Sequence, residues 1–195
     1  MLVYYMIASI EGKNGYLISA PHAFSHYRRN LDSVIKQGEP WTDSIVREVC
    51  STASCHGILI EKSVGYDPNS DLLEKNPYKQ EVDKLIGKRK VKLFVDIHGL
   101  SDRHSYDFAI YFPLRYRKSQ ELAYKLAEFL SKGVLKDSLV VVLNMKDNDQ
   151  ETLTEFVAKK RKIPAIQLEI ARYIRDDEEL RESLTLALSE FLIKI

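Results

Sequence analysis

Residues 91–99 read VKLFVDIHG, a nearly continuous apolar run that ends in Asp96, His98 and Gly99. A run of this kind predicts a strand, Val91–Ile97, that is buried on both faces as in the parallel sheet of an α/β protein. Asp96 and His98 are two residues apart, so they point to the same face of the strand. Polar side chains are costly on such a strand unless they are paired or bind a ligand. The stretch therefore predicts a central strand with a functional site near its carboxyl end.

Outward from this strand, short β-rich runs alternate with segments of helical periodicity. The expected strands are Leu2–Ile10, Tyr16–Ser19, Gly57–Glu61, Val91–Ile97, Tyr106–Phe112, Ser138–Leu143 and Ala165–Ile170. The expected helices are Thr42–Ser54, Tyr78–Lys88, Ser119–Lys132, Glu151–Lys160 and Asp177–Lys194. This order predicts the α/β class, as a single three-layer αβα domain over residues 1–195 with a mixed, largely parallel central sheet. The turn sequence GKNG at Gly12–Gly15 further predicts that the first two strands pair as a hairpin.

The composition excludes several classes of partner. The 195 residues carry 29 Lys+Arg and 28 Asp+Glu, a net charge of +1, so the basic surface typical of nucleic-acid-binding proteins is not expected. No apolar run reaches the roughly 18 residues of a membrane helix, and the N-terminus lacks the basic region and cleavage site of a secretory signal. Cys50 and Cys55 are too few for a disulfide framework. We therefore expect a cytoplasmic protein without a nucleic-acid or membrane partner.

Polar side chains gather where the expected strands end. They are His22 after the second strand, His98 after the fourth, and Gln167 and Glu169 within the last. Open α/β sheets bind ligands beyond the carboxyl ends of their strands. Two histidines at separate strand ends, with a carboxylate nearby, are the ingredients of a catalytic zinc site. Water bound to zinc becomes a nucleophile near neutral pH, and a nearby Glu is placed to accept its proton.

Other chemistries have weaker support in the sequence. It contains no G-x-S-x-G elbow, no G-x-G-x-x-G string and no G-x-x-x-x-G-K-[ST] string. Cys50 and Cys55 are expected to be packing residues, which leaves a cysteine hydrolase as a minor alternative. His56 and His104 lie in a helix-to-strand junction and a loop, and are expected to be incidental.

Five short motifs, in this order, resemble those of the N-formylglutamate amidohydrolase family. They are Ser19-Ala-Pro-His22, Glu39-Pro-Trp-Thr42-Asp43, Asp67-Pro-Asn69, Asp96-Ile-His98-Gly99 and Gln167-Leu-Glu169-Ile-Ala-Arg172. Together they span positions 19 to 172, and the last motif is the most specific. That family is similar in turn to zinc carboxypeptidases and aspartoacylases. The resemblance therefore implies a phosphorylase/hydrolase-like fold and hydrolysis of an amide bond.

The resemblance also implies a metal site. His22 and His98 match the histidine ligands, and Glu39 matches the third ligand. His26 and Asp43 compete with Glu39 for that place, and a solvated Gly-Glu-Pro turn is the alternative interpretation of Glu39. One Zn²⁺ is the expected ion, although Co²⁺, Mn²⁺ or Fe²⁺ suit similar ligands.

Catalytic roles follow from the same motifs. Glu169 matches the general base and acid, and its alternative interpretation is a core residue paired with Arg172. A guanidinium clamp for a substrate carboxylate is expected from Arg28 or Arg172, the two arginines closest to the site motifs.

The remaining motif residues are expected around the ligands. Asp67 and Asn69 either bind substrate, support the ligands or simply form a turn, and Gln167 is expected to contact substrate. Asp96 is expected to orient a ligating histidine, because such histidines usually donate their second N–H to a carboxylate or carbonyl.

The sequence thus predicts a metal-dependent amidohydrolase acting on a small N-acyl amino acid or short peptide that carries a carboxylate. Two departures from the family separate this chemistry from the formylglutamate substrate. Ala23-Phe24 follows His22 where Ser-Gly is common, and Ser70 follows Asn69 where an Arg is usual. The chain is also shorter than typical members. The alternative function is a non-catalytic binding or regulatory module on the same scaffold, which bound metal would distinguish.

Overall fold

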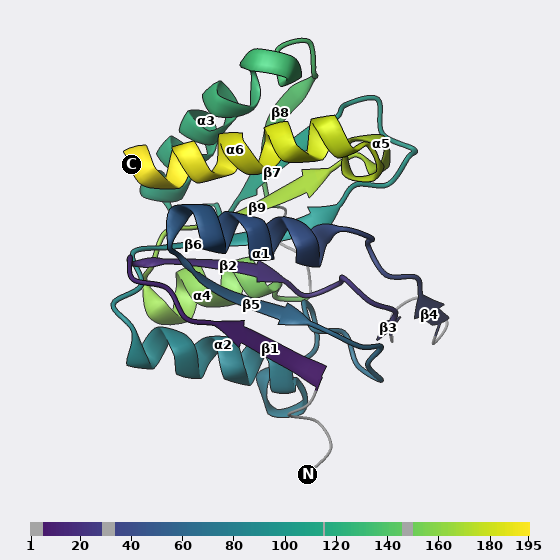
Figure 1. Cartoon of the computed structure of the whole chain (residues 1–195). Coiled ribbons are helices and arrows are strands. Elements are labelled where there is room, and N and C mark those ends of the chain that lie inside the picture. Colours follow the sequence, from purple (N-terminus) through teal and green to yellow (C-terminus); the bar gives the residue numbers. More distant parts are fainter. Residues whose placement is uncertain (1–5, 29–33, 115, 146–149) are drawn as a thin grey trace.

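A seven-stranded mixed sheet forms the centre of the protein. The structure, a computed structural model, describes residues 6–28, 34–114, 116–145 and 150–195. The strand order is β1-β5-β2-β6-β9-β7-β8 (Figure 1). The strands are β1 Ile7–Ile10, β2 Tyr16–Ala20, β5 His56–Ile60, β6 Leu93–Gly99, β7 Phe108–Phe112, β8 Val140–Asn144 and β9 Ala165–Ile170. Strands β5, β2, β6 and β9 run parallel, whereas β1 and the β7–β8 pair run antiparallel to them.

Helices cover both faces of this sheet and give three layers. One face carries α1 Thr42–Ala53, α3 Arg117–Leu130 and α6 Glu178–Lys194, and the other carries α2 Pro77–Lys88 and α4 Leu153–Arg161 (Figure 1). The short α5 Arg172–Asp176 connects β9 to α6. The predicted α/β class and αβα layering are confirmed.

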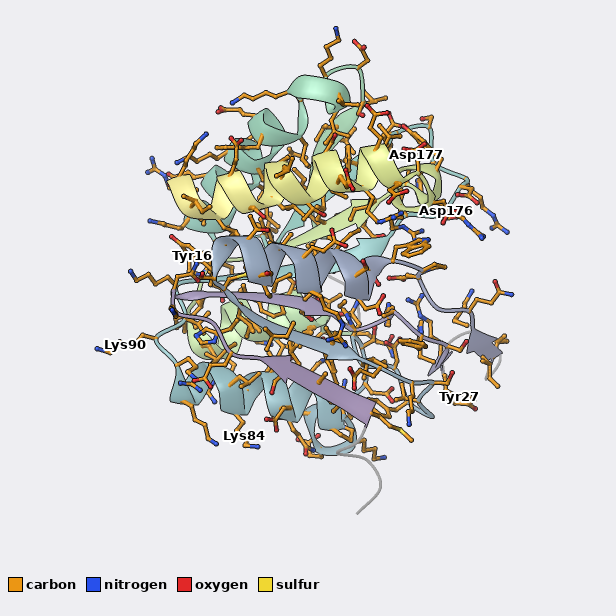
Figure 2. All side chains as sticks on the ribbon, viewed as in Figure 1. Tyr16, Tyr27, Lys84, Lys90, Asp176 and Asp177 are labelled. Atoms are coloured by element: carbon orange, nitrogen blue, oxygen red, sulfur yellow. The ribbon has the colours of Figure 1, made fainter. Side chains whose placement is uncertain are left out.

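Helix α6 shows why the apolar stripe of the sequence forms a helix in this place. Leu184, Leu188, Phe191 and Leu192 are buried in the same core cluster as residues of α1 and α3. Asp177 begins the helix by accepting a hydrogen bond from the Leu180 amide at 2.9 Å (Figure 2). These contacts place α6 across the face of the sheet opposite α2 and α4.

The predicted N-terminal hairpin is wrong. Strand β5 lies between β1 and β2, antiparallel to the first and parallel to the second. The loop between β1 and β2 instead wraps around the start of β5, where the Lys13 and Asn14 amides both donate to the Ser54 carbonyl, at 2.8 and 3.2 Å. A Cβ at Gly12 would overlap the backbone of Cys55. Glycine at this position therefore permits a close backbone approach and does not mark a two-residue turn.

Short elements were not expected from the sequence. A separate antiparallel pair, β3 His26–Arg28 and β4 Val34–Lys36, lies beyond the carboxyl ends of the parallel strands (Figure 1). Helix α5 and the 3-10 helices Leu73–Lys75 and Gly133–Leu135 are also too short to show a periodic pattern. Of the strand expected at Leu2–Ile10, residues 2–5 lie outside the described residues. None of the described helices has the length and apolar character needed to cross a membrane.

Candidate active site

Two histidines meet one carboxylate at the carboxyl ends of β2 and β6. His22 follows β2, His98 lies near the end of β6, and Glu39 belongs to the loop before α1. The His22 Nδ1 atom lies 3.3 Å from Glu39 Oε1, and His98 Nδ1 lies 3.5 Å from Glu39 Oε2. These donor atoms lie within 4.8 Å of one another. A His/His/carboxylate group of this size suits a zinc ion that keeps one position open.

The other ring nitrogen of each histidine contacts a second carboxylate. His22 Nε2 lies 2.9 Å from Asp67 Oδ1, and His98 Nε2 lies 3.0 Å from Asp96 Oδ2. Ring protons held on Nε2 by these carboxylates would leave the Nδ1 lone pairs available to a metal ion beside Glu39. His22 Nδ1 is also buried without a hydrogen-bond partner. Both observations fit the chemistry of metal-ligating histidines.

The electrostatics of this group favour a cation. Burial alone would lower the pKa of His22 and His98, but neighbouring carboxylates outweigh it and raise both pKa values. Burial would raise the pKa of Glu39, but the two imidazoles outweigh it and hold that pKa well below its ordinary value. A metal ion that binds here therefore competes with protons for the imidazole nitrogens.

Glu39 is held in place by its own loop and by β6. Its Oε2 atom accepts a hydrogen bond from the Gly99 amide at 2.9 Å, and its carbonyl accepts one from the Thr42 hydroxyl at 2.8 Å. Trp41 between them has a φ of 70°, in the left-handed region that is uncommon for a bulky residue. The Arg181 guanidinium lies over the Trp41 ring, 4.3 Å from its centroid, and helps to hold this conformation.

Arg175 is a site residue that the sequence analysis missed. It is buried and donates to the carbonyls of Pro40, at 2.6 Å, and Ile170, at 3.1 Å. It thereby connects the end of β9 to the loop that carries Glu39. A Cβ at Gly99 would lie 2.7 Å from Arg175 Nη2 and 3.0 Å from Glu39 Cβ, so a larger residue there would displace the Arg175 guanidinium. Nothing in the sequence distinguishes Arg175 from the neighbouring arginine at 172.

The carboxylate of Glu169 lies beside this group. β9 pairs with β6 so that Glu169 stands opposite His98 and Gln167 stands opposite Asp96. Gln167 Nε2 donates to Glu169 Oε1 at 2.8 Å. Burial raises the pKa of Glu169, and the nearby His98 only partly opposes this. Glu169 is thus a carboxyl group whose pKa is shifted toward the range in which it exchanges protons at neutral pH.

A cavity of about 700 Å³ opens over these residues, and Arg28, Asn69, His98, Gln167 and Glu169 all line it. Arg28 comes from β3, and its Nε atom lies 3.3 Å from Asp67 Oδ2. Asn69 Oδ1 accepts a hydrogen bond from the Leu153 amide at the start of α4, at 2.7 Å. The loop carrying Asp67 and Asn69 therefore joins the histidine group, the arginine and α4.

Three candidates from the sequence lie elsewhere. Arg172 pairs with Asp176 at 3.1 Å on the exposed side of α5 and does not line the cavity, so neither the clamp nor the pairing with Glu169 applies to it. Asp43 lies in the first turn of α1, outside both candidate ligand groups. His26 stacks on His22 with ring centroids 3.9 Å apart, in a second group with Asp67. Burial lowers the pKa of His26 to about 4.

The two cysteines and the two remaining histidines, which were expected to have no catalytic role, lie in different surroundings. Cys50 and Cys55 are buried free thiols with Sγ atoms 3.5 Å apart. His56 accepts a hydrogen bond from the Gly12 amide through Nδ1 at 2.9 Å, far from the cavity lining. His104, by contrast, lines the cavity, although it belongs to neither candidate ligand group. Its loop position in the sequence carried no indication of this.

Comparison with known proteins identifies the fold. No protein-family model and no curated protein sequence matches this chain. A gene product of Agrobacterium tumefaciens matches with a TM-score of 0.65 and 13% identity, over 96% of this chain and 93% of that one. A metallo-carboxypeptidase from Burkholderia cenocepacia matches with a TM-score of 0.62 and 13% identity, over 96% of this chain and 60% of that one. For a succinylglutamate desuccinylase from Chromobacterium violaceum the TM-score is 0.61 and the identity 14%, over 94% and 64% of the two chains. These likenesses confirm the predicted fold, and at such low identity they carry no information about substrate.

Proposed function

We propose that this protein is a zinc-dependent hydrolase that cleaves the amide bond of an N-acyl amino acid or short peptide. The observation that carries the proposal is that the two ring nitrogens of each histidine have different partners. Both Nδ1 atoms face Glu39, and both Nε2 atoms contact other carboxylates. His22, His98 and Glu39 would hold the ion. When bound, zinc polarises a carbonyl group and acidifies a water molecule. A metallo-carboxypeptidase and a desuccinylase share the fold, which is consistent with amide hydrolysis.

Glu169 is the general base and acid of the proposed reaction. It stands opposite His98 across the β6–β9 pair and lines the cavity. Its carboxylate accepts the proton of the attacking water and returns it to the leaving nitrogen. Burial raises the pKa of Glu169, which favours proton exchange by this carboxyl group. Gln167 holds one of its oxygens, so the carboxylate keeps a defined orientation.

Arg28 provides the recognition of a substrate carboxylate. The N-formylglutamate amidohydrolases that the motifs resemble usually have an arginine near the Asp-x-Asn motif, and here Ser70 follows Asn69. Arg28 reaches the same loop from β3 and is held there by Asp67. A guanidinium in the cavity binds a carboxylate through two parallel hydrogen bonds. The substrate class is therefore a small molecule that carries a carboxylate.

The test combines metal analysis with a hydrolysis assay. The purified protein is expected to contain one zinc ion, and a chelator is expected to abolish hydrolysis of N-acyl amino acids until zinc is restored. Glu169→Gln should keep the zinc and lower turnover by about 10²- to 10⁴-fold, because it removes the proton acceptor. Glu182→Gln, on the exposed face of α6, is the matched control and should leave both the zinc content and the turnover unchanged.

Stoichiometric zinc in His98→Ala would refute the ligand assignment. A protein with neither metal nor hydrolysis would favour a binding module.

A further inference from the structure

The cavity extends beyond Glu169 over β7 and β8, on the face of the sheet opposite α3. On the site face α4 packs on β6 and β9, whereas the described helix that packs on β7 and β8 is α3, on the opposite face. Tyr111 of β7 and Leu143 of β8 stand opposite one another in register, and both line the cavity. Leu143 is 36% exposed. Tyr106, Met145 and Leu100 also line the cavity, and we call these five residues the apolar wall.

The sheet fixes the order of the groups along the cavity. Neighbouring strands lie about 4.8 Å apart, so side chains on β6, β9, β7 and β8 follow one another in steps of this size. On the site face His98 stands opposite Glu169 of β9, Tyr111 of β7 stands opposite Gln167, two residues before Glu169, and Leu143 of β8 stands opposite Tyr111. Arg28 lies at the other end of the cavity. It contacts Asp67, which binds His22 through Nε2, whereas Glu39 lies on the Nδ1 side of the His22 ring. The carboxylate clamp, the hydrolytic group and the apolar wall therefore follow one another across the sheet.

This order determines which part of the substrate reaches the apolar wall. A substrate with its carboxylate on Arg28 and its amide bond between His98 and Glu169 extends its acyl group toward Tyr111 and Leu143. A formyl or acetyl group is too small to reach a wall that begins one strand beyond Glu169. An acyl chain of several carbons reaches it.

The charges at this end of the cavity disfavour a second carboxylate on the acyl group. Arg28 is the one Lys or Arg among the described residues that line the cavity, and it lies at the opposite end. The acidic residue near the apolar wall is Glu155, whose Oε2 atom accepts from the Thr152 amide and hydroxyl at 2.9 and 2.8 Å. A carboxylate placed on the wall would face Glu155, and the described basic residue that lines this end of the cavity is His104, whose ring stacks on Tyr106 with centroids 4.9 Å apart.

We propose that the acyl group of the substrate is large and apolar, an aromatic ring or an aliphatic chain seated against the apolar wall. This inference rests on the proposed function and narrows it. The substrate class becomes an N-aroyl or medium-chain N-acyl amino acid with a single carboxylate. Formyl and succinyl conjugates are then poor substrates.

The first test varies the acyl group on a constant amino acid. Zinc-loaded protein is assayed with N-formyl-, N-acetyl-, N-hexanoyl-, N-benzoyl- and N-succinylglycine. Each methylene buried on the wall is expected to raise kcat/KM about four-fold, so the hexanoyl conjugate should exceed the formyl conjugate by about 100-fold or more. The succinyl conjugate should fall well below the hexanoyl one. Equal values across the series, or a preference for the succinyl conjugate, would overturn the inference.

Binding provides a readout that does not need turnover. The same glycine conjugates are titrated calorimetrically into Glu169→Gln, and the Kd is expected to fall about four-fold per methylene. If no conjugate is hydrolysed by the zinc-loaded protein, the proposed function fails, and the binding series alone decides the inference. A Kd that does not depend on acyl length would refute the apolar wall while leaving any observed hydrolysis intact.

A substitution on the wall locates the effect. Leu143→Glu places a charge on the wall and should reduce the hexanoyl-to-formyl ratio of kcat/KM about ten-fold or more. Leu143→Ala should reduce it in the same direction and serves if the glutamate variant does not fold. The matched control is Leu186→Glu, because Leu186 is 59% exposed on α6, in the other helix layer. The control should keep the wild-type ratio. A wild-type ratio in Leu143→Glu would show that the acyl group binds elsewhere.

Discussion

His22 and His98 each present one ring nitrogen to a supporting carboxylate and the other to Glu39. Asp67 and Asp96 therefore matter as much as the ligands, because they fix the tautomer of each ring. Both aspartates were visible in the sequence as members of short motifs near the strand ends. Spacing along a strand predicts a shared face, and this is why the Asp96–His98 pair could be anticipated.

For Arg172 and Arg175, the sequence does not predict which side chain is buried. The alternation of a strand stops at Ile170, and α5 then begins at Arg172. Residues of this one-turn helix point in different directions, so that Arg172 is exposed and Arg175 is buried against the Glu39 loop. A helix this short has no periodic pattern from which its buried side could be inferred.

Arg28 gives a prediction at this scale. Arg28→Lys should raise KM for a carboxylate-bearing substrate about ten-fold and leave kcat nearly unchanged, because an ammonium lacks the planar fork of a guanidinium. Steady-state kinetics on one N-acyl amino acid measures both constants. Arg172→Lys changes an exposed residue in the same way and should alter neither constant. Equal effects of the two substitutions would contradict the assignment of the clamp.

At the scale of the elements, apolar patterns predict where the core strands and helices lie in the sequence. They do not predict which strands pair with each other in the sheet. The hairpin expected around GKNG is wrong because periodicity predicts that a segment is a strand but not which strand lies beside it. Here the pairing is set by β5, which enters between β1 and β2 after the whole of α1. The loop of residues 61–76 likewise has no repeating pattern, although it carries Asp67 and Asn69.

Asn76 tests how that loop is held. It is buried, its Nδ2 atom donates to the carbonyls of Asp67, Pro68 and Asp71, and its Oδ1 atom accepts from the Lys79 amide. Asn76→Ala removes a helix cap and leaves buried carbonyls unpaired, so the free energy of unfolding should fall by about 2–3 kcal/mol. Zinc affinity should fall about ten-fold, since Asp67 orients His22. Urea unfolding and zinc titration measure these effects.

Asn76→Asp serves as the control for this prediction. The aspartate can still accept from the Lys79 amide but cannot donate to the three carbonyls. Because its second oxygen faces three buried carbonyl oxygens, an unfolding free energy no higher than that of Asn76→Ala is expected. Wild-type stability in Asn76→Ala would show that the loop does not depend on these bonds.

Asp83 predicts a pH dependence at the contact between α2 and α4. Its carboxylate accepts from Arg161 Nε at 2.7 Å and from Lys160 Nζ at 3.0 Å. Burial would raise the pKa of Asp83, but the two cations outweigh it and lower that pKa. Because the folded pKa lies below the unfolded one, the stabilisation is complete above about pH 4 and is lost as the pH falls through the folded pKa.

Asp83→Asn should therefore lower the free energy of unfolding at pH 7 by about 1 kcal/mol. The difference from wild type should shrink as the pH falls below about 4, because the wild-type carboxylate becomes protonated there. Denaturant unfolding at a series of pH values measures the difference. A difference that stays constant down to pH 2 would mean that the charge of Asp83 does not contribute.

In the molecule as a whole, the site lies at the sheet's carboxyl edge while two large apolar clusters fill the space between the layers. The protein should therefore stay folded without metal, and zinc should add stability in proportion to its affinity. At a free zinc concentration of about 100 times Kd the gain is about 2.7 kcal/mol, or roughly 5–10 °C in Tm for a chain of this size. Thermal unfolding with a chelator, and then with added zinc, measures the shift. His98→Ala should show none, and an undiminished shift in that variant would place the zinc elsewhere.

The place of β5 also bears on how the chain folds. In β1, Ile7 pairs with Ile60 of β5. On the other side of β2 from β5, Tyr16 pairs with Leu93 of β6. Neither β1 nor β2 pairs with a strand close to it along the chain, so these two strands cannot form sheet structure locally. During synthesis they remain unpaired until β5 has left the ribosome, and the sheet assembles from distant contacts, which is slow. The β1–β5 pairing should accordingly form late in refolding.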